Sequence, residues 1–138
     1  MSVTQLDHLN LSVRNFKETV DWYNKVFGFM VVEEGIQDKK PWGIIKNNDA
    51  LLCIYEQPDF VLLDRFESAE KFIHYLAHFG LRIDNQQEWE KTIVREKIAV
   101  MYDGPIRWPN SVSWYIKDPT GWEIEVALWD NNRIKFQQ

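Results

Sequence analysis

One pattern of strand and helix occurs twice in this chain, at a spacing of seventy residues. Residues 6–13 read LDHLNLSV and residues 76–83 read LAHFGLRI, with leucine first, histidine third and leucine sixth in both. The same spacing separates two Asn-x-x-Glu signals, which begin at Asn15 and Asn85 and are typical of helix starts. A chance likeness between two strands would not extend to the start of the next helix, so we interpret the pattern as an internal duplication.

Each copy predicts one helix and four strands. In the first copy LDHLNLSV alternates apolar and polar residues, as a half-buried strand does, and a helix follows that Gly28 is placed to end. Three short segments suited to strands come next: FMVVEE, WGIIKN and ALLCIYE. The corresponding segments of the second copy are IAVMY, SVSWYIK and WEIEVALW, of which the last two are joined by the turn sequence DPTG.

This order predicts an α+β fold made of two tandem βαβββ modules. We expect the modules at residues 1–56 and 72–138, with a connection over 57–71, within one domain that spans residues 1–138. One helix covers only one face of a four-stranded sheet. If the two sheets curve toward each other, their uncovered faces form a shared cup.

Composition narrows the range of partners. The 138 residues carry a net charge of −5, and the pI of about 5.2 gives no electrostatic reason to expect nucleic acid or a membrane surface. A single cysteine excludes an intrachain disulfide and fits a reducing compartment. The first residues do not resemble a signal peptide, and no apolar run approaches the roughly 20 residues that span a bilayer. We therefore expect a cytoplasmic protein that acts on a small molecule.

The polar sides of the predicted strands carry several chemically active residues: His8, Asn10 and Ser12; His78 and Arg82; Ser113, Tyr115 and Lys117; and Glu123 and Glu125. Two neutral imidazoles and one carboxylate form a metal site with open positions, which suits Fe(II), Mn(II), Zn(II), Ni(II) or Co(II). Such an ion can bind two neighbouring oxygens of a substrate and stabilise negative charge on them. By strand alternation alone, Glu123 and Glu125 are both candidates for the carboxylate.

The two ends of the chain resemble a known family. LDHLNLSV followed by NFKETVDWYNKVFGF resembles the opening of the vicinal-oxygen-chelate (VOC) proteins, the superfamily of glyoxalases, bleomycin resistance proteins and extradiol dioxygenases. WYIKDPTGWEIEVA resembles its closing signature, in which Asp-Pro-x-Gly precedes a strand with Ile/Leu-Glu. The resemblance covers nearly the whole chain and implies a glyoxalase-like fold. It places the metal ligands at His8, His78 and Glu125.

The resemblance has further implications for the site. Many glyoxalase-type members add a fourth ligand, Glu or Gln, at a position where this chain has Cys53 or Ile54, depending on the alignment of the turn. This departure favours three-ligand members, such as fosfomycin-modifying enzymes and extradiol dioxygenases. Tyr115 matches a substrate-facing tyrosine of the fosfomycin-modifying relatives, so we assign it a catalytic role. Family members of this size usually dimerise, which implies a homodimer.

Four residues are candidates for substrate binding: Asn10, Arg82, Arg107 and Trp108. Asn10 stands where fosfomycin-modifying relatives commonly carry Thr, and the loop over 102–112 lacks their Lys/Ser-rich phosphonate pocket. Trp108 beside Arg107 suggests a wall for a flat or apolar substrate. We therefore favour a metal-dependent enzyme with dioxygenase-like chemistry. The alternatives are a glyoxalase-type lyase, a fosfomycin-modifying transferase, and a bleomycin-resistance-like protein that sequesters a ligand without catalysis.

Overall fold

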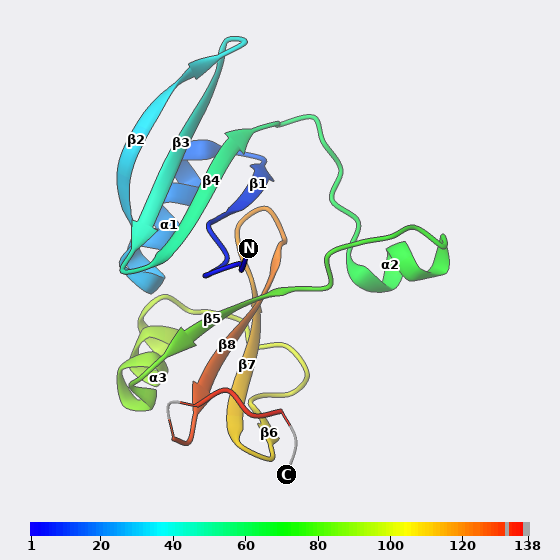
Figure 1. Ribbon diagram of the computed structural model, residues 1–138. Helices are drawn as coiled ribbons and strands as arrows, with labels where there is room; N and C mark the ends of the chain where they lie inside the picture. Colours follow the sequence, from blue (N-terminus) through cyan, green and yellow to red (C-terminus); the bar gives the residue numbers. More distant parts are fainter. Residues whose placement is uncertain (132, 137–138) are drawn as a thin grey trace. The chain divides into compact units, whose positions relative to one another are not determined.

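The chain folds into two compact units, Met1–Val61 and Leu62–Gln138. The structure is a computed structural model that describes residues 1–131 and 133–136. Each unit contains one four-stranded mixed sheet (Figure 1). The α+β class and the βαβββ order of the predicted modules are confirmed. Within the described residues, no helix has the length and apolar character needed to cross a membrane.

Unit 1 holds the first sheet, with strand order β1-β4-β3-β2. Its elements are β1 (Leu9–Val13), α1 (Phe16–Phe27), β2 (Met30–Gln37), β3 (Lys40–Asn47) and β4 (Ala50–Glu56). Helix α1 begins where the Asn15 side chain accepts a hydrogen bond from the Glu18 backbone N–H at 2.8 Å, and it ends at Gly28, whose φ is 69°. The core lies between this helix and the sheet, where Tyr23 and Ile45 are fully buried.

Unit 2 repeats this arrangement, with strand order β5-β8-β7-β6. Its elements are α2 (Arg65–Glu70), β5 (Phe79–Ile83), α3 (Gln86–Arg95), β6 (Ile106–Trp108), β7 (Ser111–Lys117) and β8 (Glu123–Trp129). Asn85 caps α3 by accepting from the Glu88 backbone N–H at 3.1 Å. Helix α3 packs on one face of the sheet, where Trp89 meets Trp114 edge to face at 6.5 Å between ring centroids. The opposite face carries the polar residues.

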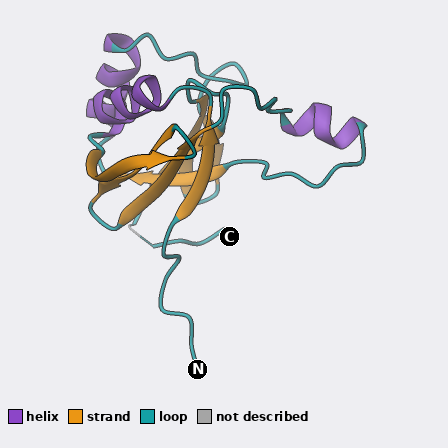
Figure 2. Cartoon of the chain, turned by 90° about the horizontal axis from the view of Figure 1, so that it is seen from above, coloured by secondary structure: helices purple, strands orange, loops and turns teal. Residues whose placement is uncertain are grey.

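Two segments differ from the predictions. The strand predicted at IAVMY is wrong, because residues 98–102 form no strand in the structure. The segment ends in a turn at Tyr102, whose φ of 57° a strand cannot accommodate. The edge strand β6 forms instead at Ile106–Trp108, inside the predicted loop. The connection also contains a helix, α2, whose N-cap Asp64 forms a capping box with Glu67. Figure 2 shows α2 with a loop on either side of it.

The duplication extends to the register of the strands. Cys53 on β4 lies opposite Ile44 on β3, and Glu125 on β8 lies opposite Tyr115 on β7. Strands β1 and β5 pair in parallel with β4 and β8 in the corresponding register. Cys53 and Glu125 therefore hold equivalent positions. This register selects Cys53, rather than Ile54, as the counterpart of the family's fourth-ligand position.

Candidate functional site

The face of the unit 2 sheet opposite α3 brings two of the predicted metal ligands together. His78 directly precedes β5, and its Nε2 lies 3.0 Å from Oε2 of Glu125 on the adjacent strand β8. Two ligand atoms that are each about 2.1 Å from a metal ion, at a right angle, lie about 3.0 Å apart. The same distance fits a hydrogen bond from an imidazole N–H to a carboxylate. The pair therefore fits two adjacent ligands of one ion and is also stable without it.

The second oxygen of Glu125 is held by the neighbouring strand. The Ser113 hydroxyl on β7 donates to Oε1 of Glu125 at 2.6 Å, and Ser113 is fully buried. A short hydrogen bond to a charged acceptor fixes the carboxylate plane. As a result, Oε2 is directed toward His78. The Glu125 side chain keeps 20% of its surface exposed, so the site remains open to solvent.

A second carboxylate faces the other nitrogen of the same imidazole. Oε1 of Glu123 lies 3.9 Å from Nδ1 of His78. It also accepts a hydrogen bond from the Tyr102 hydroxyl at 3.2 Å and lies 3.7 Å from Nη1 of Arg65. Glu123 is only 7% exposed, so these neighbours compensate the burial of its charge. The structure thus distinguishes the two carboxylates: Glu125 faces Nε2, and Glu123 faces Nδ1.

Tyr115 lies beside these groups on β7. Its ring meets the His78 ring edge-on, with centroids 5.5 Å apart, and the residue is 6% exposed. Burial raises the pKa of Tyr115, and the charge of Glu125 raises it further. Tyr115 is therefore a neutral phenol at neutral pH. It can donate a hydrogen bond or a proton at this site.

The predicted residues His8 and Asn10 belong to unit 1. His8 directly precedes β1, as His78 precedes β5, so the two histidines are equivalent in the fold. The His8 side chain is 43% exposed, and its Nδ1 lies 2.7 Å from the Asp7 carboxylate. Asn10 is exposed on β1. Across residues 1–131 and 133–136, no group of three or more His, Cys, Asp and Glu side chains is arranged to hold a metal ion.

The two predicted arginines lie at different places on the unit 2 sheet. Arg82 is exposed on β5, and its register partner is Ala127. Arg107 donates two hydrogen bonds to the Asp130 carboxylate, one of them at 2.8 Å, and lowers the pKa of that carboxyl. Arg107 pairs with Val112, so its side chain lies on the opposite face from Tyr115. Trp108, the next residue, lies on the Tyr115 face.

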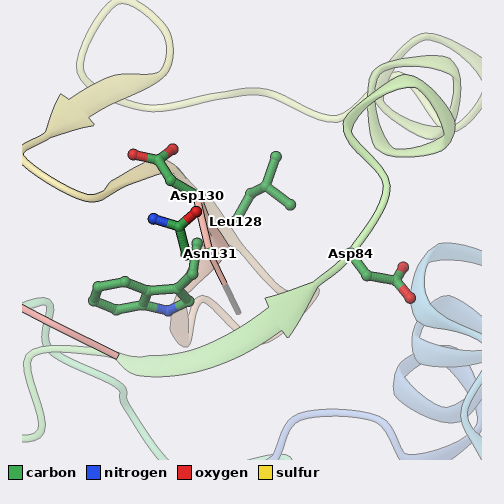
Figure 3. Close-up of a pocket in the computed structure, with 5 residues that line it drawn as sticks. Asp84, Leu128, Asp130 and Asn131 are labelled. Carbon is green, nitrogen blue, oxygen red and sulfur yellow. The ribbon is translucent and has the colours of Figure 1, made fainter. Parts of the chain in front are cut away.

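A separate hollow of about 400 Å³ lies at the far ends of β5 and β8, and it is lined by Asp84, Leu128, Trp129, Asp130 and Asn131. Figure 3 shows Asp130 and Asn131 close together, whereas the carboxylate of Asp84 points away from them. The hollow contains the partner of Arg107. It shares no lining residue with the His78–Glu125 pair, which lies at the start of these strands.

Three residues of the site, Ser113, Tyr102 and Arg65, have no role assigned from the sequence, and Glu123 is predicted only as an alternative metal ligand. Strand alternation places Glu123 and Ser113 on this face but does not reveal their contacts. Tyr102 comes from a loop that the sequence predicts as a strand, although Asp103 followed by glycine is a turn signal. Arg65 comes from α2 in the connection, where no sequence pattern indicates a site.

The superfamily model for Glyoxalase/Bleomycin resistance protein/Dioxygenase matches residues 5–126, a span that includes His8, His78 and Glu125. The chain belongs to this superfamily. Comparison with curated proteins yields no match. The resemblance drawn from the sequence is thereby confirmed at the level of the VOC superfamily.

Several solved structures share this VOC fold. A glyoxylase/bleomycin resistance protein/dioxygenase domain from Frankia sp. EAN1pec is 13% identical, with a TM-score of 0.76 and coverage of 96% of both chains. A glyoxalase family protein from Enterococcus faecalis is 18% identical, with a TM-score of 0.73 and coverage of 90% of this chain and 97% of that one. The fosfomycin resistance protein FosX from Listeria monocytogenes, complexed with Mn(II) and sulfate, is 14% identical, with a TM-score of 0.68 and coverage of 92% and 93%. At these identities the likeness concerns the fold.

Proposed function

We propose that this VOC protein is a metal-dependent enzyme that binds a small substrate through two adjacent oxygens on a divalent ion: Fe, Mn, Zn, Ni or Co. His8, His78 and Glu125 would hold the ion. The observation that carries the proposal is the distance of 3.0 Å between Nε2 of His78 and Oε2 of Glu125, with the second carboxylate oxygen held by Ser113. One nitrogen and one oxygen donor at this separation fit the ligand preferences of these metals.

When bound, the metal supplies exchangeable positions for substrate oxygens and stabilises negative charge that develops on them. The protein's own residues orient the substrate and move protons. Tyr115 is a neutral phenol whose ring lies against that of His78, so it can donate a proton to a substrate oxygen bound beside it. Trp108 lies on the same face and provides an apolar wall. Asn10, Arg82 and Arg107 remain predicted substrate-binding residues, although Arg107 is engaged by Asp130.

We favour dioxygenase-like chemistry on a catechol-like ring. Tyr115, whose ring lies against that of His78, and Trp108 on the same face of the sheet are aromatic side chains that support a flat substrate. The register aligns Cys53, which is neither a carboxylate nor an amide, with the fourth-ligand position of the glyoxalase type. The missing fourth ligand counts against a glyoxalase-type lyase, and the loop over 102–112, which lacks a Lys/Ser-rich phosphonate pocket, counts against a fosfomycin-modifying transferase. These two reactions are the second candidate, and ligand sequestration without a metal is the third.

Metal binding by the purified full chain tests the proposal. The protein is expressed with each candidate metal, and the metal bound per chain is measured by mass spectrometry. The dissociation constant for the metal is then measured by competition with a chelator. We expect about one ion per site, and affinity at least about 100-fold lower in His8→Ala, His78→Ala and Glu125→Ala, because each removes a ligand. The third histidine provides the control: His74→Ala should bind as the parent protein does.

A chain that binds no divalent metal, or that keeps its affinity in Glu125→Ala, contradicts the proposal. A metal-free protein that binds an aromatic ligand supports the sequestering alternative. Oxygen consumption with catechols, isomerisation of methylglyoxal–thiol adducts and loss of fosfomycin then distinguish the three reactions. In Tyr115→Phe we expect a lower kcat with unchanged metal affinity.

We further propose that the protein works in the cytoplasm as a homodimer. Within each chain, the predicted modules, residues 1–56 and 72–138, would act together as a single domain. Light scattering over a range of concentrations measures the mass in solution. A mass that stays at that of one chain, 16.5 kDa, contradicts the dimer.

A further inference from the structure

The carboxylate of Glu123 lies next to the metal site but is not part of the proposed ligand set. Nδ1 of His78 is buried and has no hydrogen-bond partner among the described residues, and Oε1 of Glu123 lies 3.9 Å from it. The same oxygen accepts from the Tyr102 hydroxyl and lies near the Arg65 guanidinium. A shift of about 1 Å would bring Glu123 within hydrogen-bond distance of His78.

The fold itself does not require a carboxylate at this position. Glu123 lies opposite Lys117 on β7, and its equivalent in unit 1, Leu51, lies opposite Lys46 on β3. Unit 1 therefore builds the same pair of strands with an apolar residue. Burying a carboxylate is costly unless it is paired, and unit 2 supplies two partners, Arg65 and Tyr102, from outside the sheet. This arrangement indicates that the Glu123 carboxylate serves His78, the residue that it faces, rather than the fold.

We propose that Glu123 is a positioning residue for His78. A neutral imidazole carries its proton on one nitrogen, and only the other nitrogen can bind a metal. By accepting a hydrogen bond from Nδ1–H, Glu123 would leave Nε2 without a proton, so that its lone pair can bind the ion held beside Glu125. Arg65 and Tyr102 orient the carboxylate. The inference rests on the proposed function, because His78 needs this tautomer only as a ligand.

The affinity of the full chain for Zn(II), measured by competition with a chelating dye, tests this role. Glu123→Leu copies the residue of unit 1, and Glu123→Gln keeps the shape without the charge. We expect the dissociation constant to rise about 10- to 100-fold in Glu123→Leu and less in Glu123→Gln. Asp130→Asn is the matched control, because it removes another arginine-paired carboxylate of unit 2 away from His78 and should leave the affinity unchanged.

A second measurement reports the tautomer directly. In the Zn(II)-loaded protein labelled with ¹⁵N-histidine, NMR correlations across the imidazole ring should show a proton on Nδ1 of His78 that exchanges slowly with solvent. In Glu123→Leu at saturating Zn(II), the proton should exchange faster. Arg65→Gln should also raise the dissociation constant for Zn(II). Because Arg65 is partly exposed, we expect this variant to fold even if Glu123→Leu does not.

The outcomes separate this inference from the proposed function. Zn(II) bound equally tightly by the parent and Glu123→Leu, with the same proton exchange, overturns the positioning role and leaves the metal site standing. A lower melting temperature with unchanged affinity also overturns it, because Glu123 would then only stabilise the fold. A parent protein that binds no divalent metal overturns both.

Discussion

The two sheets share one register, but they present different chemistry on the face away from the helix. At three equivalent pairs of positions, unit 1 carries apolar or thiol side chains and unit 2 carries acids and a phenol: Leu51 and Glu123, Cys53 and Glu125, and Ile44 and Tyr115. Unit 1 adds an aromatic stack of Trp42 on Tyr55, with centroids 6.0 Å apart. The same strand arrangement therefore forms with uncharged side chains at these positions in unit 1, and only unit 2 carries reactive side chains there.

The difference extends to what surrounds each face. In unit 2 the carboxylates have donors nearby: the Ser113 hydroxyl for Glu125, and the Arg65 and Tyr102 side chains for Glu123. In unit 1 burial, and then the negative charges of Asp7 and Glu33, raise the pKa of Cys53. A carboxylate is therefore accommodated at the unit 2 position, whereas the surroundings of Cys53 disfavour negative charge.

The largest expected effect tests whether the hydrophobic cores of the two units contribute equally to stability. Ile45 on β3 and Ile116 on β7 hold matching positions, and both are fully buried. We expect Ile45→Ala and Ile116→Ala each to lower the free energy of unfolding by about 2–5 kcal/mol, because each leaves a cavity. Urea denaturation followed by circular dichroism measures this. Val94→Ala, at an exposed site on α3, is the control, and a loss below about 1 kcal/mol in either core variant would show that the cores differ.

A smaller effect is expected at the polar face of unit 2. Ser113→Ala removes the donor to Oε1 of Glu125, so we expect a loss of about 1–3 kcal/mol in the free energy of unfolding. The same change should weaken metal binding about tenfold, because the carboxylate is no longer oriented. Chemical denaturation and chelator competition measure the two quantities. Ser111→Ala, two residues earlier on the same strand, should leave the metal affinity unchanged; a matching loss there argues against a specific role for Ser113.

A further prediction concerns the N-caps of α1 and α3, which occupy equivalent positions in the two units. Asn15 and Asn85 each accept a hydrogen bond from the backbone N–H three residues later. Asn15→Ala and Asn85→Ala should each cost about 1 kcal/mol of stability, and Asn→Ser at the same positions should restore most of it. Thermal unfolding followed by circular dichroism reports both. If serine restores nothing, the asparagines act by something other than capping.

The smallest effect concerns the thiol of unit 1. Because the pKa of Cys53 is raised in the folded state, the unfolded chain loses the thiol proton at lower pH than the folded one. The stability due to this group is therefore fully present below the pKa of the unfolded thiol, and it is lost as the pH rises from that value through the higher pKa of the folded state. We expect the pH midpoint for alkylation by iodoacetamide to lie higher in the native protein than in urea. A lower native midpoint would indicate an activated thiol instead.

Part of the site could be predicted because it depends on local patterns. Strand alternation places Glu123, Glu125 and Tyr115 on one face, and the closing signature predicts Glu125 as the ligand. The structure distinguishes the two carboxylates, since Glu125 faces Nε2 of His78 and Glu123 faces Nδ1. The strand predicted at IAVMY was wrong because a short apolar run does not exclude a loop, and the chain turns at its last residue, Tyr102, which has a left-handed backbone.

The sequence by itself determined the duplicated modules, the helix caps, the turns and the superfamily, because each depends on residues close together in the chain or on a signature that stays in one segment. The tertiary structure decided which carboxylate meets which imidazole nitrogen, and it brought Arg65 and Tyr102 to Glu123. Those contacts join a helix of the connection, a loop and two strands that lie far apart in sequence. Their geometry depends on the parallel register of β5 and β8, which no local pattern encodes.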